Sequence, residues 1–123
     1  MMSNIEESRK KFNKELRTGL LGMLLLFIIN KSEEPLYGYK IIREIEIFSK
    51  GEFKLPEGTV YPILKSLETR GFLKSSWGKG KDGPRRRYYS ITSDGRILLS
   101  EIIGDWKSVN KTMGNIIHDS EVV

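Results

Sequence analysis

The chain has 123 residues, enough for one domain with a modest hydrophobic core, and its 38% hydrophobic and 30% charged residues are typical of a folded protein. With no cysteine and a single histidine, His118, it excludes disulfides and cysteine nucleophiles and offers poor material for a metal site, so we expect none. The net charge of +5 lies entirely between Lys74 and Arg96, a segment that contains seven basic and two acidic residues. Such a segment indicates either polyanion binding or a solubilising loop, and charge alone does not separate the two.

The first predicted element is a helix from Glu6 to about Asn30. Its apolar residues recur every three or four positions: Phe12, Leu16, Leu20, Met23 and Phe27. Gly19 and Gly22 weaken the pattern, which allows two helices or one bent helix. The apolar run 20–29 would span only about 15 Å, half of a bilayer's hydrocarbon core, and no small-residue cleavage site follows it. We therefore expect a buried core helix in a cytoplasmic protein with no membrane partner.

Two shorter helices are predicted next. The first runs from Gly38 to Phe48, and its apolar face comprises Ile41, Ile45 and Phe48, with Ile42 beside them. The second begins at Pro56, whose missing N–H costs nothing at a first helical position, and ends at Gly71. Its core stripe comprises Val60, Leu64 and Leu67. Pro62 removes one hydrogen bond inside this helix and is expected to bend it.

A hairpin is predicted after these helices, with strands 72–77 and 86–91 around the glycine-rich loop 78–84. If Ile91 faces the core, alternation places Tyr89 and the stem of Arg87 on the same side. Arg86 and Tyr88 then point outward, and Arg85 lies near the turn. We expect Arg85 and Arg86, helped by Lys79 and Lys81 on the loop, to contact a polyanion. Arg87 is expected to be partly structural.

The last predicted element is a long helix from Ile97 to Ile117, preceded by a capping sequence at Thr92-Ser93-Asp94. A heptad-like seam predicts that it packs against another helix: Ile102, Trp106, Val109, Met113 and Ile116. The order of elements predicts a mainly α fold with a small β-hairpin, a winged helix-turn-helix. We divide it into residues 1–95, a DNA-binding domain that includes the N-terminal helix, and residues 96–123, a dimerisation helix.

The helix after Pro56 also has features that suit contact with phosphates. Its first turn presents free N–H groups and the positive end of the helix dipole, and Gly58 allows close approach of another backbone. Thr59 and Tyr61 bring hydroxyl groups, and Lys65 and Ser66 lie on outer faces. Taken alone, an ordinary amphipathic core helix explains the same pattern.

Several blocks together resemble the PadR family of transcriptional regulators, over about residues 20–106. They are Leu36-Tyr37-Gly38-Tyr39, Glu57-Gly58-Thr59-Val60-Tyr61-Pro62 with Leu64 and Leu67-Glu68, Gly71-Phe72-Leu73, Gly83-Pro84-Arg85-Arg86-Arg87-Tyr88-Tyr89, Ile91-Thr92 and Gly95-Arg96. The chain is most similar to the compact branch, which has a single long helix after the wing. It departs from the family at Tyr37 and Pro56, where histidine and serine are common.

The resemblance implies a homodimeric winged-helix repressor that releases its operator in double-stranded DNA when a small molecule binds. We expect the operator to be palindromic and expect no cofactor. The resemblance assigns DNA contacts to Tyr39, Gly58, Thr59, Tyr61, Lys65 and Ser66, and wing contacts to the basic residues before Tyr88, with Tyr88 included. It places the dimer interface on the first and last helices, through Phe12, Leu16, Leu20 and the seam of the last helix. Trp106 either stacks on a flat aromatic effector or anchors the interface, and we favour the anchor.

Two other classes of function compare differently with the sequence. A winged-helix scaffold can serve as a protein-interaction module without a DNA role, because fold does not determine function. An enzyme is not expected, since no nucleophile–base pair, phosphate loop or metal-ligand set is present and the one histidine lies near the C-terminus.

Overall fold

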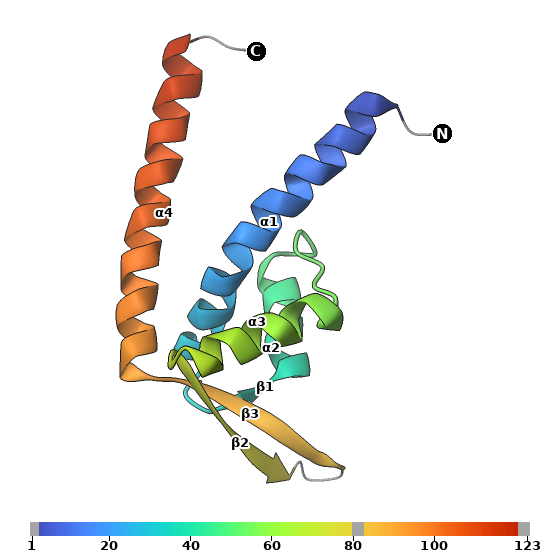
Figure 1. The fold of residues 1–123 in the computed structure, drawn as a ribbon, viewed down its shortest axis with the longest axis vertical. Coiled ribbons are helices and arrows are strands. Elements are labelled where there is room, and N and C mark those ends of the chain that lie inside the picture. The colour runs from blue at the N-terminus through green and yellow to red at the C-terminus, as the bar shows by residue number, and fades with distance from the viewer. Residues whose placement is uncertain (1–2, 80–82, 121–123) are drawn as a thin grey trace.

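A computed structural model describes residues 3–79 and 83–120. Within them the chain forms four helices and three strands (Figure 1). In chain order they are α1 (Asn4–Lys31), β1 (Leu36–Tyr37), α2 (Gly38–Phe48), α3 (Glu57–Thr69), β2 (Leu73–Lys79), β3 (Arg85–Ile91) and α4 (Ser93–Ser120). The predicted mainly helical fold with a β-hairpin is confirmed, and the winged helix-turn-helix comprises α2, α3 and the β2–β3 wing.

Helix α1 is a single helix from Asn4 to Lys31, although two glycines lie within it. Ser3 starts it with a capping box, in which its Oγ accepts a hydrogen bond from the Glu6 N–H at 3.1 Å. Only its C-terminal part enters the core, through Leu21, Leu25, Leu26, Ile28 and Ile29. The stripe that contains Phe12 and Leu16 is exposed in the single chain.

The sheet has one strand more than the sequence predicted. β1 pairs antiparallel with β3, with Leu36 opposite Tyr89 and Tyr37 opposite Tyr88, so the strand order is β1-β3-β2. β2 pairs with β3 over seven positions, from Leu73 opposite Ile91 to Lys79 opposite Arg85. The hairpin is therefore attached to the start of α2 through its central strand.

The core lies where α1, α2, α3, the first turns of α4 and the part of the sheet nearest the helices meet. Val60, Leu64 and Leu67 of α3 are buried there as predicted, as are Ile41, Ile42 and Ile45 of α2. The prediction for Phe48 is wrong, because the sequence placed this residue on the core face of α2 and its side chain is 57% exposed. It lies in the last turn of α2, where an open hollow separates that turn from α1, so its ring is not packed into the core and meets the Lys31 ammonium, at 3.9 Å.

Three helix starts differ from the sequence prediction, and α1 differs by only two residues because it begins at Asn4 rather than Glu6. Pro56 is the N-cap of α3 rather than its first residue, and the helix runs through Pro62 without a break in its span. α4 begins at Ser93 rather than Ile97. Thr92 precedes it, and its Oγ1 accepts from the Gly95 N–H at 3.0 Å and donates to the Gly71 carbonyl at 2.7 Å. Thr92 thus joins the start of α4 to the end of α3.

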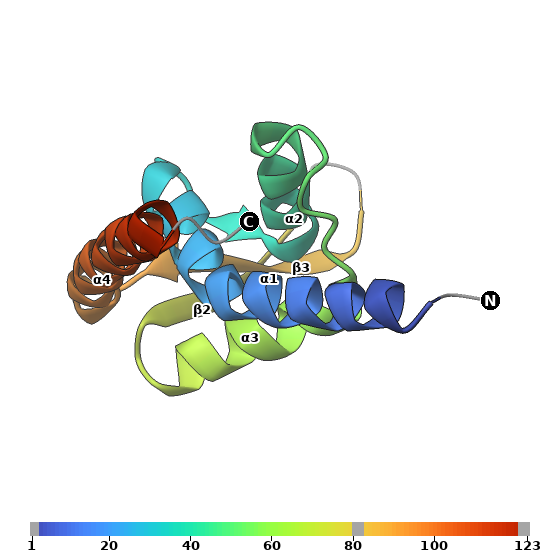
Figure 2. The same cartoon turned by 90° about the horizontal axis from the view of Figure 1, so that it is seen from above.

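Helices α1 and α4 extend away from the sheet toward the same end of the molecule, and the wing projects from the opposite end (Figure 1). Seen from above, α2 and α3 lie on opposite sides of α1 (Figure 2). None of the helices in residues 3–79 and 83–120 is both long and apolar enough to cross a bilayer. The two ends of the molecule therefore differ, with helix surfaces at one and the hairpin at the other.

Candidate nucleic-acid interface

The first surface of interest is the outer face of α3, with the start of α2 beside it. Gly58, Thr59, Tyr61, Lys65 and Ser66 are all exposed on α3. Tyr39, in the first turn of α2, is 53% exposed. Because the core stripe of α3 takes the opposite face, this outer face is open to a ligand along the whole helix.

Tyr61 has a second role, as a contact between the two helices. Its side chain is 40% exposed, yet its ring lies over Gly38, where an added Cβ would come 2.5 Å from Cε1 and 2.7 Å from Cζ and Oη. Partial burial, and then the charge of Glu57, raises the pKa of Tyr61 above its ordinary value, so the phenol keeps its proton to higher pH than a free tyrosine. A side chain at position 38 would collide with this ring unless the ring moved, and glycine avoids the collision.

The second surface is the wing, where one face of the hairpin brings a tryptophan together with two arginines. Trp77 lies opposite Arg87 in the register, and Arg85 is its diagonal neighbour on the same face. The guanidinium carbons of Arg85 and Arg87 lie 5.5 Å and 5.1 Å from the centre of the Trp77 ring. Trp77 is itself 55% exposed, so the face of the wing that continues from the core is open to solvent here.

The opposite face of the wing has its own aromatic group. The guanidinium of Arg86 lies over the ring of Tyr37 at 4.4 Å, and Tyr88 meets the same ring edge-on at 5.7 Å. Tyr88 is half-buried, and it covers Gly78 on the neighbouring strand so closely that a Cβ there would come 2.9 Å from its ring. Tyr88 therefore supports the wing, and the contact with DNA expected of it stays a prediction.

Arg87 also connects the wing to α3. Its Nε donates a hydrogen bond to Ser75 Oγ at 3.0 Å, and that hydroxyl donates to the carboxylate of Glu68 on α3. The sequence predicted that Arg87 is partly structural, and this connection supports the prediction. All three arginines are nevertheless exposed, so the predicted alternation determines their neighbours and not their burial.

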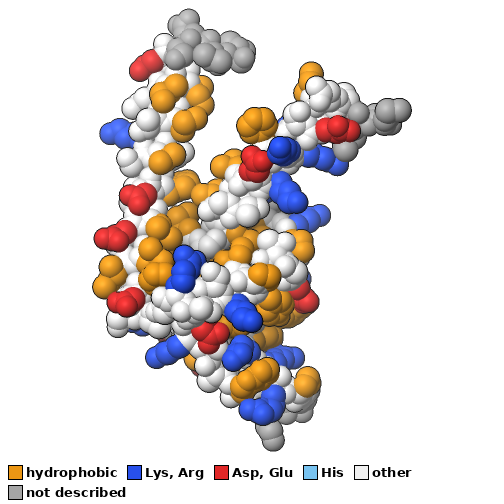
Figure 3. Space-filling view, viewed as in Figure 1, with side chains coloured by type: hydrophobic (Ala, Val, Ile, Leu, Met, Phe, Trp, Pro, Cys, Tyr) orange, Lys and Arg blue, Asp and Glu red, His pale blue; other side chains and the backbone are white. Residues whose placement is uncertain are grey.

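The two surfaces meet in one hollow of about 260 Å³ between the start of α2, α3 and the wing. Its lining is almost wholly aromatic or basic: Tyr37, Gly38, Tyr39, Tyr61, Trp77, Arg85, Arg86 and Arg87. In Figure 3 the basic side chains at the wing end are mixed with hydrophobic ones. Four of the residues predicted to contact DNA therefore line the same hollow: Tyr39, Tyr61, Arg85 and Arg86.

The other predicted contacts lie outside this hollow. Gly58, Thr59, Lys65 and Ser66 continue the surface along α3. Lys79 ends β2, paired with Arg85, and Lys81 lies outside the described residues. Sequence reasoning missed Tyr37 and Trp77, although each is an aromatic residue in or beside a strand that pairs with the arginine-rich segment.

The residues predicted for a dimer interface lie on α1 and α4, away from the wing. Phe12, Leu16, Trp106, Val109, Met113 and Ile116 are exposed in the single chain, whereas Leu20 and Ile102 are half-buried. A hollow of about 410 Å³ between the two helices is lined in part by Phe27, Leu99 and Ile103. The apolar side chains of both helices are thus available to a second copy.

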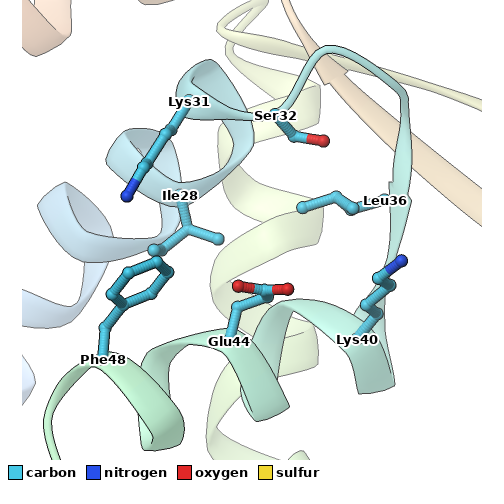
Figure 4. Close-up of a pocket in the computed structure, with 7 residues that line it drawn as sticks. All are labelled: Ile28, Lys31, Ser32, Leu36, Lys40, Glu44 and Phe48. Carbon is cyan, nitrogen blue, oxygen red and sulfur yellow. The ribbon is translucent and has the colours of Figure 1, made fainter.

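A separate hollow of about 210 Å³ lies between the end of α1 and α2 (Figure 4). The Lys31 ammonium sits over the Phe48 ring at 3.9 Å, and Leu36 and Glu44 point into the space between the helices (Figure 4). Neither this hollow nor its lining includes a residue predicted to bind DNA.

Comparisons with known proteins agree with this arrangement. Residues 25–101 match the model of the "Transcriptional regulator PadR-like family". An uncharacterized protein of Lysinibacillus sphaericus is 33% identical over 96 residues, which cover 78% of this chain and 85% of that protein. A PadR family transcriptional regulator from Eggerthella lenta superposes with a TM-score of 0.77 at 28% identity, covering 94% of each chain. A PadR-like regulator from Bacillus cereus gives 0.69 at 28% identity, covering 84% of this chain and 96% of that one. A family match over more than half of the chain, with the wing and α3 inside the matched range, shows that this protein belongs to the PadR-like family of transcriptional regulators.

Proposed function

We propose that this protein is a homodimeric, sequence-specific repressor that binds double-stranded DNA and releases it when a small molecule binds. Helix α3 would enter the major groove, and the wing would contact the sugar–phosphate backbone. The observation that carries the proposal is the hollow between α3 and the wing, which is lined by three arginines and four aromatic residues. Membership of a family of transcriptional regulators supports it.

The chemistry of this surface suits a duplex better than a small anion. The basic residues of the wing and the exposed hydroxyls of α3 extend over two elements, as phosphates along a backbone require. The N-terminal turn of α3 adds free N–H groups, since its N-cap, Pro56, makes no side-chain capping bond. Phosphate contacts would give affinity and register, and the side chains along α3 would read base edges.

The proposed dimer places two copies of α3 on one side of the duplex. The exposed apolar side chains on α1 and α4 would be covered by the second copy, because soluble monomers rarely leave a large apolar surface open to water. Two recognition helices must then enter successive major grooves, so half-sites should lie about ten base pairs apart. The operator would be palindromic.

The proposed effector would act through α4. Trp106 is 41% exposed in the single chain, and a second copy would bring the two Trp106 rings toward the same interface. We assign Trp106 first to anchoring that interface, and second to stacking on a flat aromatic molecule between subunits.

A gel-shift titration on DNA upstream of the protein's own gene, across a range of salt concentrations, tests DNA binding. We expect log affinity to fall linearly with log salt. The double variant Arg85→Ala/Arg86→Ala should make that slope shallower by up to about 3.6, or roughly 0.9 for each of the four phosphates that a dimer would no longer neutralise. A matched variant, Lys10→Ala/Lys14→Ala, removes the same charge from exposed positions on α1 and should leave the slope unchanged. Absence of any preference over random DNA would refute the repressor and favour a protein-interaction module.

Sedimentation equilibrium tests the dimer, and adding flat aromatic compounds to the gel shift tests the effector. Val109→Glu should give a monomer, because it buries a charge in the proposed interface, whereas Asn115→Glu, on the opposite face of α4, should stay a dimer. A wild-type monomer at micromolar concentration would contradict the proposal.

A further inference from the structure

We propose that Trp77 is a positioning residue of the wing, whose ring holds the guanidinium groups of Arg85 and Arg87 in place for neighbouring DNA phosphates. The inference rests on the proposed function. It adds a residue that none of the predicted contacts includes, and it explains why a large aromatic side chain is exposed on the wing.

The register of the hairpin creates this arrangement. Trp77 and Arg87 are directly opposite on β2 and β3, and side chains two residues apart on one strand share a face, which places Arg85 beside them. The ring centre lies 5.1 Å from the Arg87 guanidinium carbon and 5.5 Å from that of Arg85. Both distances are within the range of a cation–π contact, which is strongest for tryptophan. The Trp77 ring thus makes cation–π contacts with two guanidinium groups.

A ring is a better support for a phosphate-binding arginine than a carboxylate would be. An ion pair uses the N–H donors of the guanidinium, which must then be freed before DNA can bind. A cation–π contact uses the face of the ring and leaves the N–H donors available. Among the described residues, the only ion pair is Arg17 with Glu52, far from the wing. Arg87 gives only its Nε to Ser75, which leaves its terminal amino groups unused by that bond.

The position of Arg87 is in turn defined relative to α3. Ser75 joins Arg87 to Glu68 of α3 by two successive hydrogen bonds. Through Trp77, this connection extends from Arg87 to Arg85, nearer the tip of the wing. The charges of the wing are therefore held at a set distance from the helix that would read the bases, which reduces the side-chain entropy lost on binding.

Trp77 is not required by the core. The buried part of β2 is Leu73, and Trp77 is more than half exposed four residues farther out. A purely structural role would be to strengthen the hairpin by cross-strand packing. That role predicts a loss of stability without a specific dependence on the arginines, so the two can be separated by experiment.

The experiment measures the dissociation constant for duplex DNA at several salt concentrations, with thermal unfolding of each variant. Each exposed cation–π contact is equivalent to about a two- to fivefold effect on binding, so Trp77→Ala should weaken binding on the order of tenfold. Trp77→Phe keeps a ring and should retain most of the affinity. Trp77→Leu keeps the bulk without the π face and should behave like Trp77→Ala even if the alanine variant folds poorly. Phe48→Ala, which removes another exposed ring beneath a cation, should not change binding.

A double-mutant cycle shows whether Trp77 acts through the arginines. In an Arg85→Ala/Arg87→Ala background, Trp77→Ala should cause no further loss of affinity. An equal loss in both backgrounds, or wild-type affinity in Trp77→Leu, would overturn the inference while leaving DNA binding intact. If the wild-type protein itself fails to bind duplex DNA at low salt, the proposed function is wrong and this inference is wrong with it.

Discussion

The contact between Gly38 and Tyr61 gives a sharp test of how the helix-turn-helix is assembled. Gly38 has no positive φ, so its backbone would accept alanine, and only the Tyr61 ring excludes a side chain. In Gly38→Ala the new Cβ would lie 2.5 Å from the ring, whereas ordinary contacts begin at 3.4 Å. The ring must therefore retreat by about 1 Å, which it can do because it is partly exposed.

The cost of this displacement can be estimated from two opposing terms. Inserting a methyl group into an occupied space costs roughly 1–3 kcal/mol, and the flexible ring places this case near the low end. In a helix interior alanine is favoured by up to about 1 kcal/mol over glycine, but Gly38 is the first residue of α2, so we expect only a small part of that gain. We expect Gly38→Ala to lower the free energy of unfolding by about 1 kcal/mol, a fall in melting temperature of roughly 4 °C for a chain of this size.

The partner substitution turns this estimate into a test. In a Tyr61→Ala background the space is empty, so Gly38→Ala should be neutral or slightly stabilising, which gives a coupling energy of about 1–2 kcal/mol between the two positions. Urea unfolding of the four proteins at one concentration measures it, because a dimer's stability depends on concentration. The same loss from Gly38→Ala in both backgrounds would show that the ring is not the obstacle. DNA affinity should fall in Gly38→Ala, since the displaced Tyr61 lies on the proposed interface.

Three further predictions concern the rest of the framework. Gly95→Ala should destabilise the protein by about 2 kcal/mol in thermal unfolding, because the new Cβ would collide with the Phe72 carbonyl, a backbone group that cannot move away easily. As the control, Gly104→Ala on the same helix places its Cβ where no atom lies within 4 Å, so it should be neutral or stabilising by up to about 1 kcal/mol. Thr92→Val should cost about 1–2 kcal/mol in the same assay, since it removes the cap of α4 and a bond to the Gly71 carbonyl. Burial raises the pKa of Tyr89 above 10.0, so the folded protein favours the neutral phenol. The stability that Tyr89 contributes is present below pH about 10 and is lost as the pH rises through its raised pKa. Urea unfolding from pH about 9 to about 11 should therefore show a fall in the free energy of unfolding, and this fall should be smaller in Tyr89→Phe.

Local patterns predicted most of the elements. The bounds of α2, Gly38 to Phe48, follow from its apolar spacing, and the structure has the same bounds. The buried stripe of α3 and the pairing of β2 with β3 were likewise predictable, because each depends on residues close in sequence. β1 was not, since two residues carry no periodicity and their pairing with β3 spans about fifty positions.

Burial was harder to predict than secondary structure. Helix α1 has apolar residues on more than one side, and periodicity does not say which side the chain itself covers. Leu21, Leu25 and Ile28 are buried, while Phe12 and Leu16 stay exposed. The same limit applies to Phe48, which follows Ile41 and Ile45 at helical spacing but ends beside an open hollow.

The arginine triplet shows where strand alternation stops being informative. Alternation correctly groups Arg87 with Tyr89 and separates Arg86, but it suggests one covered face and one open face. Beyond Tyr89 the hairpin projects past the core, so both faces meet solvent and each has its own aromatic ring, Trp77 on one and Tyr37 on the other. Arg85 and Arg86 are therefore not equivalent, although they are adjacent and both exposed. Because Arg86 rests on Tyr37, Arg86→Ala should weaken DNA binding by the same factor with or without Trp77. The effect of Arg85→Ala on DNA affinity, in contrast, should shrink when Trp77 is replaced by leucine. If replacing Trp77 changed the effects of both arginine substitutions equally in affinity measurements, this separation would be refuted.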